Sequence, residues 1–143
     1  MSKIITVETN GAPLPAGHYA QAKRSRQHVY ISGQLPIRPS GEGLADESFE
    51  SQAAQALYNM LAILKAAGGT PADLVKVTAY IVDVANWPRF NQVYAANLGD
   101  ARPARTVVPV PELHYGYLVE VDAIAVIRHD AFKAEAVNAG EEM

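Results

Sequence analysis

Two residues that could do chemistry stand in late segments of the chain that are otherwise typical of β-strands. Arg105 lies in the segment 103–108, and Glu120 lies in 119–126, where apolar residues alternate at a period of two. Burying a carboxylate is costly unless it is paired or neutralised. A guanidinium can hold a carboxylate through two parallel hydrogen bonds, and an acid can handle a water molecule and a proton. The pattern leaves two interpretations open: a structural ion pair at a sheet end or subunit contact, and a functional site.

Other common kinds of active site find no support in the sequence. The chain has no cysteine, which excludes disulfides, thiolate zinc sites and cysteine nucleophiles. Its four histidines are scattered, so we expect no metal site. No phosphate-binding loop or dinucleotide fingerprint is present, and Ser32 before Gly33 is not the strained turn of a nucleophilic serine. The arginine and the glutamate are therefore the leading candidates.

The composition indicates one folded domain. The chain has 143 residues, of which 49% are hydrophobic and 19% charged. The net charge of −3 argues against general binding of nucleic acid, and we interpret the cations of 23–26 as a solvated turn. No signal peptide and no membrane-spanning run is recognisable, so a cytoplasmic protein is expected. We expect the domain to cover 1–130 and the alanine-rich, acidic residues 131–143 to form a tail.

Two predicted helices must help to position Arg105 and Glu120. Apolar side chains recur at spacings of three and four over 47–67, and Gly68 supplies a stop. A second helix is expected after Asn86, which would cap it, with Pro88 in its first turn and Gly99 after its end. Phe90, Tyr94 or Val93, and Leu98 would form its buried face.

The remaining elements are strands, which makes an α+β fold with two helices against one sheet of four or five strands. Glycine and proline punctuate these segments, and Gly33 is expected to end the second of them. The predicted strands are 3–8, 28–32, 75–82, 103–108 and 119–126.

Seven short segments, in this order and spacing, resemble the RidA/YjgF family of small enamine/imine deaminases. The resemblance implies a chorismate-mutase-like fold, with a mixed sheet that has both helices on one face. It also implies a homotrimer with a central barrel and with sites in clefts between subunits. The segments are Gly17–Ala22, Val29–Pro36, Gln55–Met60, Val75–Thr78, Phe90–Tyr94, Pro103–Arg105 and Val119–Ala125.

The activity implied by the resemblance is hydrolysis of reactive 2-aminoacrylate-type enamines, or of 2-imino acids such as 2-iminopropanoate, to 2-oxo acids and ammonia. The family needs no cofactor and no metal, and its partner is a small molecule rather than nucleic acid or a membrane. Arg105 would bind the substrate carboxylate, and Glu120 would orient or activate the attacking water. Burial should raise the pKa of Glu120 while Arg105 should lower it, which leaves its protonation state open.

The resemblance assigns further residues to substrate binding. Tyr19 would close the cleft, Ser32 and Gly33 would line it, and the glycine would let the backbone approach the ligand. Without the resemblance, Tyr19 is an ordinary loop tyrosine, Gly33 a strand-ending turn and the helical Tyr94 a core residue. Val107 stands where many members have cysteine, and its backbone would make the contact. The full set of expected substrate-binding residues is Tyr19, Ser32, Gly33, Asn91, Val107, His114 and Tyr115.

The chain departs from the family in the loop that holds His114 and Tyr115. Many members carry a short apolar–proline–polar loop there. We expect the two rings to project into the neighbouring subunit's cleft and to alter substrate preference. Two rival functions stay open: a catabolic deaminase or hydrolase for a larger imine or enamine, and a non-enzymatic small-molecule-binding or chaperone-like protein. The presence of both Arg105 and Glu120 counts against the non-enzymatic alternative. The acidic charge disfavours an RNA-directed activity.

Overall fold

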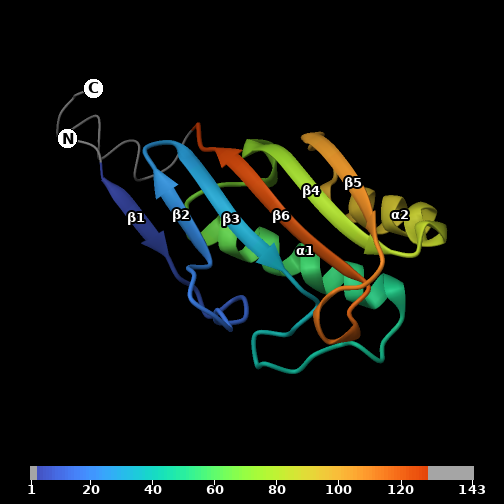
Figure 1. Ribbon diagram of the computed structural model, residues 1–143. Helices are drawn as coiled ribbons and strands as arrows, with labels where there is room; N and C mark the ends of the chain where they lie inside the picture. The colour runs from blue at the N-terminus through green and yellow to red at the C-terminus, as the bar shows by residue number, and fades with distance from the viewer. Residues whose placement is uncertain (1–2, 129–143) are drawn as a thin grey trace.

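The computed structural model describes residues 3–128, and within them one six-stranded sheet packs against two helices (Figure 1). The strand order is β1-β2-β3-β6-β4-β5, and every pairing is antiparallel except β4 with β5. The elements are β1 Ile4–Val7, β2 Ala22–Ser25, β3 His28–Gln34, α1 Phe49–Ala66, η1 Pro71–Asp73, β4 Leu74–Val82, η2 Val84–Asn86, α2 Trp87–Leu98, β5 Ala104–Val110, η3 His114–Gly116 and β6 Val119–Val126.

This arrangement confirms the predicted α+β fold with both helices on one side of the sheet. We expected four or five strands, whereas the sheet has six, because β2 was not predicted. The expected tail 131–143 and its boundary at residue 130 lie outside the described residues. Within the described part of the chain, no helix has the length and apolarity needed to cross a membrane.

Alternation along the central strands gives the sheet two different faces. On the helix face, residues of β4 and β6 are buried against α1 and α2, as the period of two predicts. On the other face, which we call the open face, the alternate residues of the same strands are half-buried, and no described helix covers them. The helix-face residues are Val77, Ala79, Ile81, Val119, Val121, Ala123 and Ala125.

Both predicted helices are confirmed, with ends set by local capping. α1 begins after Ser48, whose side chain accepts a hydrogen bond from the Ser51 amide at 3.1 Å. It ends before Gly68, whose φ of 98° lies in the left-handed region that favours glycine. The predicted capping of α2 by the Asn86 side chain is wrong, because that side chain donates to the carbonyl of Val82 instead.

Of the cations that we interpreted as a solvated turn, Lys23 and Arg24 lie in strand β2, where that interpretation is wrong, whereas Arg26 lies exposed in the turn that follows. β2 pairs with β1 and β3, and Arg24 is only 3% exposed on the helix face. The Arg24 guanidinium donates to the carbonyls of Ala67 at 2.6 Å and Arg26 at 2.7 Å. Ala67 closes the C-terminus of α1, where carbonyl groups lack helical partners and a cation is favoured.

Replacing Arg24 with methionine is therefore expected to lower the free energy of unfolding by about 3 kcal/mol, because hydrogen bonds to charged groups contribute about 1.5–3 kcal/mol each. Urea denaturation measures this change. Lys23→Met is the matched control, because Lys23 is exposed and bonds only a threonine hydroxyl in the described residues. Equal effects of the two substitutions would show that Arg24 does not hold the end of α1.

Candidate active site

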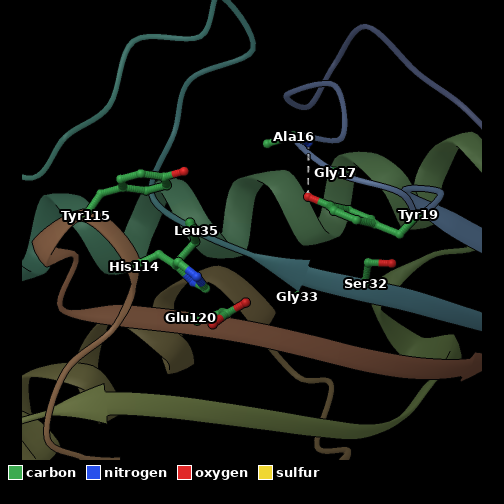
Figure 2. A pocket seen from close by; sticks show the side chains of 9 residues that line it. All are labelled: Ala16, Gly17, Tyr19, Ser32, Gly33, Leu35, His114, Tyr115 and Glu120. Carbon is green, nitrogen blue, oxygen red and sulfur yellow. Dashed lines mark hydrogen bonds between the residues drawn. The ribbon is translucent and has the colours of Figure 1, made fainter.

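A cavity of about 420 Å³ brings six of the predicted site residues together (Figure 2). It opens over the open face, where the loop before β2, the end of β3 and the η3 turn with the start of β6 meet. The lining residues are Ala16, Gly17, Tyr19, Ser32, Gly33, Leu35, His114, Tyr115 and Glu120.

Glu120 is a half-buried carboxyl in this cavity, opposite Tyr80 in the register of β6 with β4. Burial raises the pKa of Glu120, His114 lowers it, and Asp122 on the same face raises it. The predicted effect of burial is confirmed. Arg105 is not among the described groups that act on this pKa, and the group that lowers it is His114. A carboxyl with a raised pKa is suited to exchange protons near neutral pH.

Gly33 makes room for the Glu120 carboxyl. The strand β3 continues through Gly33 to Gln34, with an irregular register against β6 in this stretch, so the expected strand end at Gly33 is wrong. A Cβ atom at Gly33 would overlap Oε2 of Glu120. We expected the glycine to let backbone approach a ligand. In the structure, the absence of a side chain at Gly33 leaves the space that the Glu120 carboxyl occupies.

Tyr19 and Ser32 form the wall on the other side of the cavity. Ser32 lines the cavity, and its hydroxyl donates to the carbonyl of Ala20 at 2.7 Å. The Tyr19 hydroxyl accepts a hydrogen bond from the Ala16 amide at 3.3 Å (Figure 2). The Tyr19 side chain is 52% exposed, so its ring is not packed in the core as that of an ordinary loop tyrosine would be.

The turn that carries His114 has a constrained backbone. Tyr115 has φ 59° and Gly116 has φ 77°, two consecutive residues in the left-handed region. This conformation costs a residue with a side chain about 1–2 kcal/mol. In Figure 2 the His114 ring points toward Glu120, while the Tyr115 ring lies farther out and is 75% exposed. The two rings are in contact, with centroids 5.7 Å apart.

Two buried amides of α1 hold the cavity walls in place. The Gln52 side-chain oxygen accepts a hydrogen bond from the Leu118 amide at 2.9 Å, two residues before Glu120. The Asn59 amide donates to the carbonyl of Leu35, a lining residue, at 3.2 Å. A buried amide is costly without partners, so these bonds fix the two segments relative to the helix.

Arg105, Val107 and Asn91 lie outside this cavity. In the register of β5 with β4, Arg105 is opposite Val77 and Val107 is opposite Ala79, so both side chains belong to the helix face. Glu120 belongs to the open face, and β4 separates its strand from β5. Arg105 and Glu120 therefore do not meet within one chain, and no structural ion pair joins them there. A site that uses both needs a second copy of the chain.

Aromatic rings of α2 support the Arg105 side chain. The guanidinium carbon lies 4.9 Å from the centroid of Tyr94 and 5.8 Å from that of Phe90. Tyr94 is buried, as expected of a core residue, and its hydroxyl has no hydrogen-bond partner among the described residues. Burial raises the pKa of Tyr94, and Arg105 lowers it. Asn91 lies exposed on the same helix, one residue after Phe90.

Sequence reasoning missed three cavity residues, Ala16, Gly17 and Leu35, because they carry no reactive side-chain group. The segment Val29–Pro36, quoted above for the family resemblance, contains Leu35 and was the available signal. In the stretch 3–128, no cluster of three or more histidine, aspartate or glutamate side chains is placed to hold a metal ion.

Comparisons with known proteins agree with this geometry. The chain matches the profile of a family described as Endoribonuclease L-PSP over residues 9–127. It is 38% identical over 128 residues to the 2-iminobutanoate/2-iminopropanoate deaminase of Mus musculus, covering 88% of this chain and 95% of the relative. Several other relatives carry only the name of the RutC family.

Solved structures give the same grouping. RidA from an Antarctic Psychrobacter is 40% identical, with a TM-score of 0.82 over 86% of this chain and 99% of that one. Escherichia coli TdcF, solved with bound serine, is 33% identical, with a TM-score of 0.82 over 87% of this chain and 99% of that one. On its sequence, its sheet and the match over residues 9–127, the chain belongs to the RidA/YjgF family.

Proposed function

We propose that the protein hydrolyses small 2-imino acids, and their enamine tautomers, to 2-oxo acids and ammonia. The observation that carries this proposal is the half-buried Glu120 carboxyl, held with a raised pKa beside His114 in a cavity open to solvent. The mouse relative named for deamination of such imino acids, and the TdcF structure with bound serine, support a substrate of this size with a carboxylate.

The proposed site includes Arg105 from a second copy in a homotrimer. β5 is an edge strand, so Arg105 and the backbone of Val107 are accessible to a neighbouring chain. The open face offers a half-buried surface with apolar side chains such as Ile124 and the 48% exposed Tyr30, which suits packing against a second sheet. Each site would then combine the cavity of one chain with the β5 edge of the next.

In this site the residues divide the work of an imine hydrolysis. Arg105 holds the substrate carboxylate by two parallel hydrogen bonds and orients C2 over Glu120. With the imine nitrogen protonated, Glu120 accepts a proton from water as the water oxygen bonds to C2 and the C=N electrons move to nitrogen. The nitrogen takes up a proton, the C–N bond breaks and ammonia leaves. Loss of the hydroxyl proton then forms the carbonyl of the 2-oxo acid.

A coupled assay tests this function directly. A dehydratase generates the enamine of 2-iminopropanoate from serine or that of 2-iminobutanoate from threonine, and the release of the 2-oxo acid is followed with and without the protein. We expect acceleration by the wild-type protein and none above background by Glu120→Gln. A panel of imino acids with larger side chains distinguishes this function from that of the catabolic rival, because the rival enzyme would accelerate hydrolysis of the larger substrates only.

Two further rivals give different results in the same experiments. A binding protein would retain a 2-oxo acid or amino acid in calorimetry yet accelerate no substrate of the panel. The family description raises RNA cleavage, which a net charge of −3 disfavours. That activity would degrade a labelled RNA, and the degradation would disappear in Glu120→Gln if the same cavity were responsible.

Gly33→Ala is expected to lower turnover of the same substrates by about 10- to 100-fold, because misplacing a reacting group by about 1 Å can cost about 100-fold. The added methyl displaces the Glu120 carboxyl, which is the flexible end of a side chain, so the fold should persist. Gly11→Ala is the matched control, since a Cβ there meets its neighbours at 3.4–3.5 Å, an ordinary contact. Unchanged turnover in Gly33→Ala would contradict this placement of Glu120.

A further inference from the structure

One titratable group in the cavity has no role in the mechanism above. His114 lines the cavity on the side of the η3 turn, and its ring points toward Glu120 (Figure 2). It is exposed to the cavity and not buried in the core. Two proton transfers of the proposed hydrolysis, from the attacking water and to the departing nitrogen, need a group of the protein. A single carboxyl must otherwise serve both.

From this geometry we infer that His114 is the general acid of the site and protonates the departing nitrogen, while Glu120 acts on the water. The inference rests on the proposed function and deepens it. The imidazolium gives its proton to the amine nitrogen, and the C–N bond breaks with its electron pair on ammonia. Protonated Glu120 passes the proton taken from water back to the imidazole, and the substrate's hydroxyl proton goes to solvent. Starting from the protonated imine and water, the net products are the 2-oxo acid, ammonia and one proton.

The backbone of the turn supports this role. A strained conformation persists only where the surrounding structure holds it, and such residues cluster at functional sites. Tyr115 has φ 59°, and its ring contacts that of His114 and, at 6.2 Å between centroids, that of Tyr117. The amide of Tyr117 donates to the His114 carbonyl at 3.2 Å and closes the turn. The imidazole is thereby directed inward and not left on a free loop.

The charges around the pair suit an acid–base division. An imidazole is the side chain whose ordinary charge change falls between about pH 5 and 8. The neighbouring strand β3 contributes Ser32 and Gly33 to the cavity, and Leu35 follows the strand; none of the three titrates. The other ionisable groups facing the pair are Asp122 on β6, Tyr80 on β4, Tyr19 on the loop before β2 and Tyr115 on the η3 turn.

The test is the pH profile of kcat/KM between about pH 5 and 9 for the wild type, His114→Gln and His28→Gln. A bell-shaped profile is expected for the wild type, with an acid limb from Glu120 and an alkaline limb from His114. His114→Gln should lose the alkaline limb and fall by about 100-fold at its maximum, the lower end of general acid catalysis. Its acid limb should move to higher pH, because His114 lowers the pKa of Glu120 in the wild type.

His28→Gln is the matched control, because His28 is an exposed histidine at the start of β3, outside the cavity. It should keep the wild-type profile, and the unfolding midpoints of all variants should agree. A limb of the pH profile that arises from titration of the substrate would persist in the wild type and in both variants. If the wild type accelerates hydrolysis and His114→Gln keeps both its rate and its alkaline limb, the inference fails while the proposed function stands. If the wild type accelerates nothing, the proposed function fails, and the inference falls with it.

Discussion

Arg105→Ala is expected to lower kcat/KM for a 2-imino acid by about 100-fold or more, because two charge-assisted hydrogen bonds to the carboxylate are lost at about 1.5–3 kcal/mol each. KM should rise together with the fall in kcat, since the same bonds bind the substrate and orient C2 over the attacking water. The coupled assay over a range of substrate concentrations separates the two effects.

Arg105→Lys is the matched variant for this prediction. A lysine keeps the positive charge but not the planar fork that holds a carboxylate bidentately, so it should recover only part of the lost activity. The free energy of unfolding of Arg105→Ala should fall by at most about 1–2 kcal/mol, because the half-exposed Arg105 side chain contributes about 0.5–1 kcal/mol for each of the two rings it covers. Full turnover by Arg105→Ala would overturn the role of the arginine.

The sequence predicted best those elements whose pattern follows a single period. The apolar stripe of α1 and the alternation along β6 each identify a buried face without knowledge of any neighbour. β2 lacks such a pattern, because it has only four residues and two of them are cations. Its place in the sheet depends on pairing with β1 and β3, and the burial of Arg24 depends on the distant end of α1. Such tertiary partners are invisible to a local pattern.

The candidate site shows the same limit more sharply. Alternation assigns each residue to one of two faces of its own strand, but only the register between strands says which faces coincide. β5 follows β4 through the crossover helix α2 and pairs with it in parallel, which puts Arg105 on the helix face. Glu120 lies on the open face of an antiparallel neighbour. The sequence therefore named both residues and could not show that they stand on opposite sides of one sheet.

If the proposed site is right, that separation makes activity depend on assembly. A mixed oligomer can distinguish a site within one chain from a site between two. The two inactive variants Arg105→Ala and Glu120→Gln are unfolded together, mixed in equal amounts and refolded, and turnover is compared with that of each variant refolded alone. In a mixed assembly some contacts join an intact Arg105 to an intact Glu120. Such contacts occur only if each site takes one residue from each of two copies.

Random assortment in a closed ring of subunits should restore about a quarter of the wild-type activity, because each site has a one-in-two chance of an intact arginine and the same chance of an intact glutamate. A mixture of wild type with the Arg105→Ala/Glu120→Gln double variant is the control. It should also give about a quarter, whereas sites within single chains would keep about half. A mixture of the two single variants that stays as inactive as its parts would contradict a shared site. Recovery near a quarter would mean that Arg105 of one copy and Glu120 of the next act on the same substrate.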